Sequence, residues 1–480
     1  MKQLETFERQ DSILAHPKIP FRHVICAIST LCMTLLFSNI HVFNFTVLCM
    51  SEQADNSTAI AYNYTKQEKD LLLAAGYLGP FPAMIPLYYM VAKYGVSVSM
   101  AFCGFLSFFA TLFSPLAAYY GFWPFMVMRL IQGVPAAITS PVMSVITSHW
   151  STLEGNGVYV SILAAHYQLA PLLTMPLSAI LCESFGWEWV YYTQAVLTGL
   201  AYLAFAVIHS DKPTHSRFVS RYELRKIEKG KSHEEKHVEK AQTPIKEICK
   251  TWSIWGVWLS SVGGTIGFSI FLQYGPTYLN QVLHYSLTTT GWSAALPYIF
   301  SCVARIFAQP LTANCEFLGE KLAAIVSTTI SQGTMALSFI VLVFCPVEWS
   351  QVASVCYSLV IVANGLNGVG ITRSAQLVSR QHLRFVYTVR GFANSTVGLF
   401  LPLLVNVMAP DNTHAQWTKL FIVIFVIVLS SNIFFILVAD VKPAPWTMGT
   451  VEVDDRDSDE DIEKMEDKIR KLEGDEEEKY

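Results

Sequence analysis

The sequence predicts an all-α membrane protein whose twelve transmembrane helices form two halves of six. Only 15% of the 480 residues are charged, whereas soluble globular chains carry about 25%, and the mean hydropathy is +0.38. Apolar runs such as 24–50 and 420–438 reach the length of about 20 residues that a helix needs to cross a bilayer. These observations exclude a soluble enzyme and indicate a multi-pass membrane protein.

Hydropathy places six spans before a polar middle stretch and six after it. The expected limits in the first half are 22–50, 69–92, 96–118, 122–148, 156–182 and 188–208. Those in the second half are 254–282, 289–311, 321–345, 350–374, 385–408 and 416–439. Two equal sets of spans predict two packed halves with a solute site between them, near the middle of the membrane.

Lys and Arg gather in the segments expected on one side of the membrane, and this sets the predicted orientation. The stretch between the halves is rich in both residues, and the head carries several. Because positively charged loops stay in the cytoplasm, both termini are predicted to be cytoplasmic. The expected parts are a cytoplasmic head (1–21), a first six-helix half (22–208), a basic cytoplasmic loop (209–253), a second six-helix half (254–440) and an acidic cytoplasmic tail (441–480).

The one long loop predicted outside the cytoplasm, 51–68, carries two glycosylation sequons, at Asn56 and Asn63. The acidic tail is interpreted as a solvated segment, with a phosphorylation or partner site around Ser458 as the alternative. The ten cysteines show neither metal-ligand spacing nor a disulfide framework, so no metal or cofactor is expected. A plasma membrane and a lysosomal or vesicular membrane are both compatible with the sequence.

Several segments resemble, in order, the solute carrier 17 family of the major facilitator superfamily, whose members include sialin, the vesicular glutamate transporters and the sodium-phosphate type organic anion transporters. They are GYLGPFPAMIPLYYMVAKYG (76–95), VMRLIQGVPAAITSPVMSVITSHW (127–150), LTMPLSAILCESFGWEWVYY (173–192), SDKPTHSRFVSRYELRKI (210–227), QYGPTYLNQVL (273–283), SAALPYI (293–299) and APDNTHAQW (409–417). The resemblance covers about 22–446. It implies the major facilitator fold and the transport of an organic anion.

The fourth span departs from the family pattern. The family motif resembles R-x-x-E-G-x-x-E-G, but this chain has Arg129, Gln132 and Ala136 at the three charged positions. The first span of the family often carries an arginine, and the segment SNIHVFNFTV offers only His41. The chain therefore looks like a divergent branch, and the resemblance does not fix the coupled ion.

Arg129 is the residue predicted to hold the anion. Positions 129, 132, 133, 136, 137 and 140 share one helix face, and all of them except Arg129 and Gln132 are small residues. Small residues mark helix contacts, and a charge inside the membrane usually faces the bundle interior or a wet cavity. The alternative is that Arg129 snorkels toward the outer end near Trp123. In a cavity its planar guanidinium suits a carboxylate or another oxyanion, and the resemblance implies the same role.

Seven further residues are predicted to contact the solute or line its path. Helix packing is the alternative for each, because interhelical hydrogen bonds use the same residue types. His166 and Gln168 lie about 200° apart on a helix, so at most one of them is expected to face the cavity squarely. The seven residues are Gln132, Tyr77, His166, Gln168, Tyr274, Asn364 and Asn367.

Carboxylates are missing from the middle of the expected spans, which weakens the case for proton coupling. Glu68 and Asp70 fall at the predicted outer mouth, and Arg390, near the inner end of the eleventh span, is predicted to snorkel. Proton-coupled carriers usually hold a titrating group inside. Because Gln132 cannot form an ion pair with Arg129, a bound anion is the natural counter-ion of this arginine.

The sequence thus predicts a transporter of a small organic anion, or of a phosphate-like anion, that works by alternating access with an undetermined coupled ion. Its expected partners are the anion, the lipid bilayer and any co-transported ion, and nucleic acid is not among them. No catalytic motif is found. Two alternatives stay open: a transporter-like sensor or scaffold that moves no solute, and a transporter of an uncharged or cationic solute.

Overall fold

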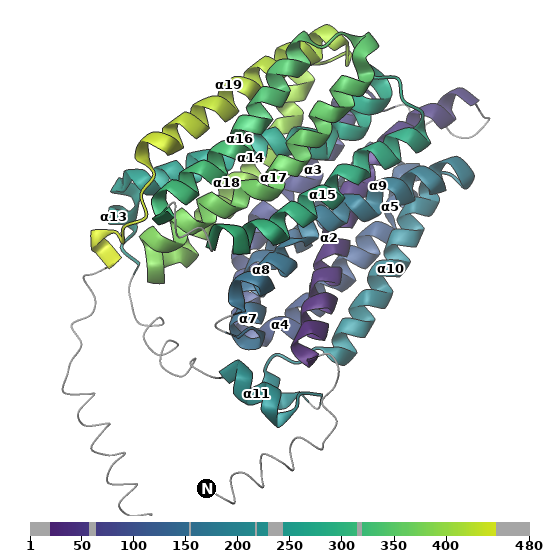
Figure 1. The fold of residues 1–480 in the computed structure, drawn as a ribbon. Coiled ribbons are helices and arrows are strands. Elements are labelled where there is room, and N and C mark those ends of the chain that lie inside the picture. The colour runs from purple at the N-terminus through teal and green to yellow at the C-terminus, as the bar shows by residue number, and fades with distance from the viewer. Residues whose placement is uncertain are drawn as a thin grey trace, which may run out of the picture.

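The computed structural model describes residues 20–56, 64–152, 155–216, 218–228, 243–313 and 319–447, and the regular structure in these ranges is helical (Figure 1). Ten helical stretches in them are long and apolar enough to cross a membrane. The predicted head up to residue 19, the basic segment 229–242, the tail from 448 onward and the sequon residue Asn63 lie outside the described residues. Asn56 is the last residue of the first helix.

The first half is a bundle in which α2 packs against α9 and α10, and α4 packs against α10. Apolar side chains from α2, α4 and α10 contribute to its buried interior, together with others from α7 and α8. The elements are α2 (Phe21–Asn56), α3 (Lys66–Leu78), α4 (Pro80–Leu112), α5 (Ser114–Tyr120), α6 (Phe122–Gly133), η1 (Val134–Ile138), α7 (Thr139–Trp150), α8 (Asn156–Ala164), α9 (His166–Ser184) and α10 (Trp187–Ile208).

The stretch Lys66–Leu112 crosses the membrane twice because it turns back at Gly95. Its 47 residues would extend about 70 Å as one straight helix, whereas the hydrocarbon core is about 30 Å thick. Gly95 has a φ of +81°, a left-handed value that glycine adopts without strain. A Cβ at this position would lie 2.2 Å from the carboxylate of Asp211, so a larger residue would displace this carboxylate.

The second half repeats the plan, with α14 and α16 each packed against α17 and α19. Its elements are α13 (Ile245–Lys250), α14 (Trp252–Thr277), η3 (Tyr278–Val282), α15 (Leu287–Ala313), α16 (Gly319–Phe344), α17 (Ser350–Ser379), α18 (Leu383–Met408), α19 (His414–Val438) and η7 (Pro445–Thr447). The ten apolar stretches give eleven crossings, because Lys66–Leu112 crosses twice. The 27-residue α15 is the twelfth, so the predicted number of crossings is present.

The halves meet where α3 packs against α18, α9 against α15 and α2 against α14. In Figure 1 the first half runs from purple to blue-teal and the second from teal to yellow. We call the membrane face at which Phe21 begins α2 and Val438 ends α19 the terminal side, and the other face the opposite side. Hydrogen bonds from Lys66 to Asn412 (3.2 Å) and from the Thr288 N–H to Glu183 (2.9 Å) join the halves on the opposite side.

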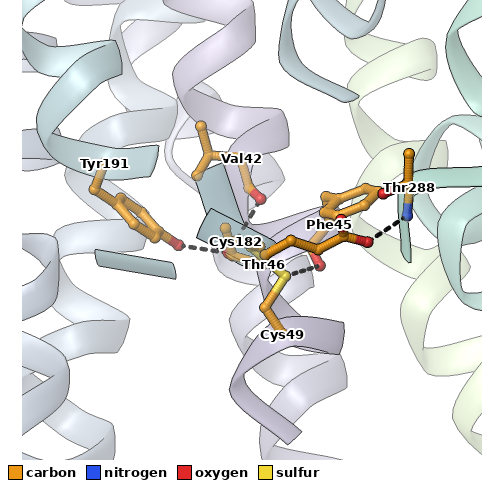
Figure 2. Close-up of a disulfide and its surroundings, with 8 residues drawn as sticks. Val42, Phe45, Thr46, Cys49, Cys182, Tyr191 and Thr288 are labelled. Carbon is orange, nitrogen blue, oxygen red and sulfur yellow. Dashed lines mark hydrogen bonds between the residues drawn. A yellow bond between two sulfur atoms is a disulfide. The ribbon is translucent and has the colours of Figure 1, made fainter. Parts of the chain in front are cut away.

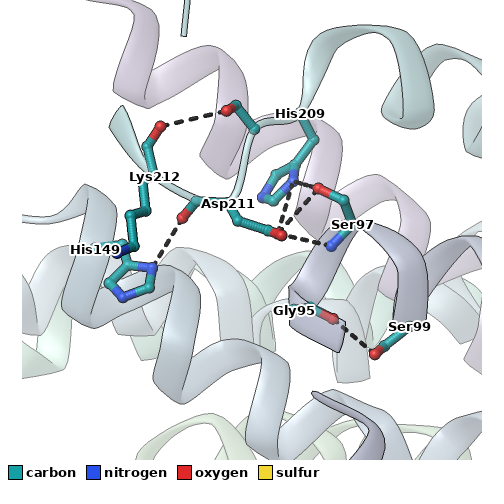
Figure 3. A network of polar contacts seen from close by, with 8 residues as sticks. Gly95, Ser97, Ser99, His149, His209, Asp211 and Lys212 are labelled. Carbon is teal, nitrogen blue, oxygen red and sulfur yellow. Dashed lines mark hydrogen bonds and ion pairs between the residues drawn. The ribbon is translucent and has the colours of Figure 1, made fainter. Parts of the chain in front are cut away.

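A polar network fixes the turn at Gly95 on the terminal side (Figure 3). The Asp211 carboxylate accepts hydrogen bonds from the backbone N–H and the hydroxyl of Ser97, at 2.8 and 3.0 Å, and so caps the returning helix. His149 lies 2.9 Å from the Asp211 carbonyl oxygen, and His209 lies 2.8 Å from the Ser97 hydroxyl. Burial lowers the pKa of His209 to about 4, although Asp211 opposes this shift.

A helix of the basic loop, α11 (Arg221–Glu228), caps the first crossing. Its buried Glu223 accepts hydrogen bonds from the N–H groups of Phe21 and Arg22 at 3.1 and 2.8 Å. A carboxylate there satisfies donors that the first turn of α2 leaves unpaired, and it complements the positive end of the helix dipole.

A disulfide joins Cys49 of α2 to Cys182 of α9 on the opposite side, with the two Cα atoms 6.1 Å apart (Figure 2). The expectation that the cysteines form no disulfide framework is therefore wrong for this pair. The two residues are 133 positions apart, and it is the packing of α2 against α9 that brings them together. A local sequence pattern does not indicate which distant cysteines come into contact.

Candidate functional site

Arg129 is sealed inside the first half. Its side chain has no exposed surface, its Nη1 donates to the Gln132 amide oxygen at 2.8 Å, and its Nε donates to the Leu72 carbonyl oxygen at 3.3 Å. The guanidinium carbon lies 5.1 Å from the centre of the Phe43 ring, a cation–π contact. Arg129 therefore neither snorkels to the surface nor lines a water-accessible space in this conformation.

Gln132 uses both ends of its amide. The oxygen accepts from Arg129, while Nε2 donates to the hydroxyls of Thr111 and Ser114 at 3.2 and 3.1 Å. A glutamate at this position could not make the two donations. We call Arg129, Gln132, Thr111, Ser114 and Leu72 the Arg129 centre; it ties α6 to α3 and to the end of α4. Gln132, predicted as a solute contact, is engaged here by packing partners.

One nitrogen of Arg129, Nη2, is buried and has no hydrogen-bond partner among the described residues. It lies against Gly76, where a Cβ would come within 2.9 Å of it. The neighbouring Tyr77 is half-buried, and its hydroxyl lies 3.4 Å from Nδ1 of His41. The ring of Tyr77 also packs against Gly398 of α18, which places Tyr77 at the boundary between the halves.

A second arginine, Arg305 of α15, bonds across that boundary. With the Gln168 amide oriented so that its oxygen faces the guanidinium, this oxygen accepts from Nη2 and Nε of Arg305 at 3.0 and 3.3 Å. Gln168 belongs to α9 and is fully buried, whereas Arg305 is half-buried. The sequence predicts Gln168 as a site residue but gives no signal for its partner, because Arg305 lies in an apolar span with no motif around it.

Arg390 of α18 joins the same region. Its Nε donates to the Ser261 hydroxyl at 2.8 Å and its Nη1 to the Thr372 hydroxyl at 3.3 Å. The prediction that Arg390 snorkels is therefore wrong, because hydroxyls on α14 and α17 hold its guanidinium within the bundle. Arg390 is half-buried and lies within electrostatic range of Arg305, and both arginines are within range of the Tyr167 hydroxyl.

His166 completes this group, which we call the Arg305 centre: Arg305, Arg390, His166, Tyr167 and Gln168. The His166 side chain is fully buried, and its Nδ1 lies 2.7 Å from the Leu163 carbonyl oxygen. Because a carbonyl only accepts, Nδ1 carries the proton and Nε2 is the free acceptor. Nε2 has no partner among the described residues.

Both His166 and Gln168 belong to the Arg305 centre, although at most one of them was expected to face the cavity. The helix is interrupted between Ala164 and His166. In the turn that follows, the Gln168 N–H bonds the Ala165 carbonyl, three residues back instead of four. Arg305 bonds Gln168 and also lies within electrostatic range of His166.

The other predicted contacts lie elsewhere. Tyr274 is buried and donates its hydroxyl proton to Asp70 at 2.8 Å, so it bridges the halves on the opposite side. The oxygen of Asn367 accepts from Gln332 at 3.1 Å, and this side chain ties α17 to α16. Asn364 is half-buried in α17, and its contact with a solute stays a prediction. Among the described residues, no group of three or more His, Cys, Asp and Glu could hold a metal ion.

Residues 26–402 match the model of the Major Facilitator Superfamily, and because this is more than half of the chain, the protein belongs to that superfamily. It is therefore a multi-pass membrane transporter and not an enzyme. The chain is 22% identical to sodium-dependent phosphate transport protein 1 of Oryctolagus cuniculus over 434 residues, which are 89% of this chain and 93% of the relative. It is 23% identical to sialin of Homo sapiens, over 82% of this chain and 79% of the relative.

A further relative is the probable small intestine urate exporter of Mus musculus, 24% identical over 82% of this chain and 81% of the relative. These relatives confirm the resemblance to the solute carrier 17 family at modest identity. Among solved structures, a D-xylose-proton symporter matches with a TM-score of 0.63 at 15% identity, over 87% of this chain and 98% of the other. A bacterial homologue of the human lysosomal transporter Spinster, inward-facing and occupied, also has a TM-score of 0.63, at 13% identity, over 88% of this chain and 97% of the other. These structures support the fold alone.

Proposed function

We propose that the protein moves a small organic anion, or a phosphate-like anion, across the membrane by alternating access, and that the Arg305 centre recognises this anion. One observation carries the proposal. Arg305 and Arg390 lie within electrostatic range of each other at the boundary between the halves, and neither takes part in the ion pairs of the described residues, which are Lys66–Asp70, His209–Asp211, Lys250–Glu247 and Arg373–Glu320.

Two guanidinium groups without a carboxylate are costly inside a membrane bundle. A bound anion offsets their repulsion and accepts the hydrogen bonds that they still offer. The anion would touch both halves, because Gln168 and His166 belong to the first half and both arginines to the second. Rocking of the halves around such a site is how carriers of this architecture expose a solute to one side at a time.

Arg129 has a different role in this proposal. Its contacts lie within the first half, so they persist when the halves rock as rigid bodies. We assign Arg129 and Gln132 to positioning α3, α4 and α6, and not to holding the anion. The sequence predicts that Arg129 contacts the anion directly. This contact stays a prediction, because Nη2 of Arg129 has no hydrogen-bond partner among the described residues.

We also propose that the terminal side faces the cytoplasm. The basic residues near the ends of the helices on that side support this orientation. The disulfide supports it as well, since disulfides persist in oxidising compartments and Cys49 and Cys182 lie on the opposite side. This orientation is compatible with a plasma membrane and with a lysosomal or vesicular membrane, because the opposite side is outside the cytoplasm in each.

Reconstitution in liposomes tests the anion proposal. Purified protein is assayed for counterflow of inorganic phosphate, urate, butyrate and glutarate, and exchange of at least one is expected. Arg305→Gln is expected to lower that exchange about 30-fold or more, because truncating one partner of a buried charged hydrogen bond costs about 2–5 kcal/mol.

Arg373→Gln is the matched control. Arg373 is exposed and pairs with Glu320 on the surface at 2.7 Å, so its loss should leave counterflow within about twofold of the wild type. Normal counterflow by Arg305→Gln would remove the proposed site. Exchange of no anion by the wild type would favour a sensor or scaffold, and exchange of only uncharged or cationic solutes would change the substrate class.

A further inference from the structure

Asp70, which the sequence places at the outer mouth, is a buried carboxylate at the contact between the halves. It lies in the second turn of α3 and is 2% exposed. Its Oδ1 accepts the Tyr274 hydroxyl of α14 at 2.8 Å and lies 3.6 Å from Nζ of Lys66. The burial was missed because it comes from α14, a helix of the other half.

The second oxygen of Asp70, Oδ2, is buried without a hydrogen-bond partner among the described residues. The charged and titratable groups around Asp70 are Lys66 and Lys69 on its own helix and Tyr274 on α14. Lys66 itself lies over the Tyr274 ring at 5.6 Å and donates to Asn412 at 3.2 Å. We call Asp70, Lys66, Tyr274 and Asn412 the latch; it closes the opposite side.

The latch makes the proton affinity of Asp70 depend on conformation. An ionised carboxylate with one buried, unpaired oxygen loses the hydration of that oxygen, and no hydrogen bond replaces it. A proton on Oδ2 removes that penalty, so closing the opposite side favours protonated Asp70. Opening it separates α3 from α14, takes away Tyr274 and returns the carboxylate to water. A ligand that binds two conformations with different affinity shifts the balance between them, and here the ligand is a proton.

Polar groups lead from the latch toward the space between the halves. Tyr274 lies within electrostatic range of Tyr77, and the Tyr77 hydroxyl lies 3.4 Å from Nδ1 of His41. His41 is itself buried, and the amide nitrogen of Asn44 lies 3.3 Å from the same Nδ1. Histidine is one of the side chains that form proton relays in membrane carriers.

We propose that Asp70 is the site at which the carrier binds a co-transported proton. The proton comes from water on the opposite side and forms a bond to Oδ2; the same O–H bond breaks when the proton is released to water on the terminal side. This inference rests on the proposed anion transport. It also gives the chain an acid on α3 in place of the carboxylates that its fourth span lacks at positions 132 and 136.

Two measurements on the same proteoliposomes separate proton coupling from anion binding. The first is counterflow at equal pH on both sides, and the second is net accumulation driven by an imposed pH gradient, each with the best-exchanged anion among phosphate, urate, butyrate and glutarate. The wild type is expected to do both. Asp70→Asn is expected to keep counterflow, because the Arg305 centre is intact, and to lose the gradient-driven accumulation.

Glu68→Gln is the matched control. Glu68 is two residues away, half-buried, and forms the capping box of α3 with Thr65, an arrangement that glutamine also supports. This variant should accumulate the anion as the wild type does. Accumulation by Asp70→Asn at the wild-type level overturns the proposal, and so does a wild type that exchanges the anion but does not respond to the gradient. A wild type without counterflow contradicts the anion proposal instead.

Lys66→Met provides a second test of proton binding at Asp70 if Asp70→Asn does not fold. Removing the cation 3.6 Å from Asp70 makes its ionised form less favourable. The pH of half-maximal gradient-driven accumulation is then expected to move to a higher value. An unchanged pH profile for Lys66→Met overturns the assignment of the proton to Asp70.

Discussion

The Arg129 centre and the Arg305 centre use the same pair of residue types in opposite ways. In each, a guanidinium inside the membrane bundle donates to the amide oxygen of a glutamine. Arg129 and Gln132 are neighbours on one helix, and Arg129 has no exposed surface. Arg305 and Gln168 come from different halves, and Arg305 is half-buried.

This difference separates a structural arginine from one suited to transport. A hydrogen bond within one half is kept through the transport cycle and stabilises the helices that it joins. A bond across the boundary must loosen when the halves rock, and a solute can then compete for it. The position of a buried charge relative to the boundary is therefore more informative than the presence of the charge in a motif.

The largest expected effect is on the stability of the Arg129 centre. Arg129→Gln leaves the Gln132 oxygen and the Leu72 carbonyl buried with fewer donors, which costs about 2 kcal/mol or more. The thermal unfolding temperature of the purified protein should fall by about 2 °C or more. The folded fraction should exchange anions with an apparent affinity close to that of the wild type. A lost affinity at unchanged stability would instead assign the anion to Arg129.

The two glutamines provide a second test. Gln168→Ala removes the acceptor that orients Arg305, and we expect the apparent affinity for the exchanged anion to fall about tenfold with little change in unfolding temperature. Gln132→Ala strands Nη1 of Arg129 and the hydroxyls of Thr111 and Ser114, so its main effect should be a lower unfolding temperature. Equal effects of the two substitutions on affinity and stability would contradict the assignment of different roles to the two centres.

A third test uses anions of different charge. Arg390 brings a second positive charge to the Arg305 centre, so Arg390→Gln should weaken exchange of a dianion more than exchange of a monoanion. Glutarate and butyrate suit the comparison because they differ by one carboxylate. We expect about a fivefold loss for glutarate and less than a twofold loss for butyrate. A uniform loss would make Arg390 a packing residue.

The smallest effect is expected from the disulfide. Cys49 and Cys182 both belong to the first half, so reduction should leave the boundary and the Arg305 centre intact. Counterflow after treatment with a membrane-permeant reductant should stay within about twofold of its starting value, while the unfolding temperature falls. A full loss of counterflow would show that the first half does not move as a rigid unit.

The twelve crossings could be predicted from the sequence because hydropathy is a local property. Arg129 was also visible, since it stands in a motif with Gln132 one turn away. The role of Arg305, the burial of Asp70 and the pair Cys49–Cys182 could not be predicted, because the partners of these residues lie far along the chain and only the packing of helices brings them together. The sequence shows the type of a residue and its approximate depth in the membrane. The role of a buried polar residue in this protein depends on which half supplies its hydrogen-bond partner.

The most direct test of the central claim is a high-resolution structure of the reconstituted protein with the exchanged anion bound. We expect density for the anion within hydrogen-bond distance of the Arg305 guanidinium, in contact with residues of both halves. Density for the anion at Nη2 of Arg129, with the Arg305 centre unchanged, would contradict the account.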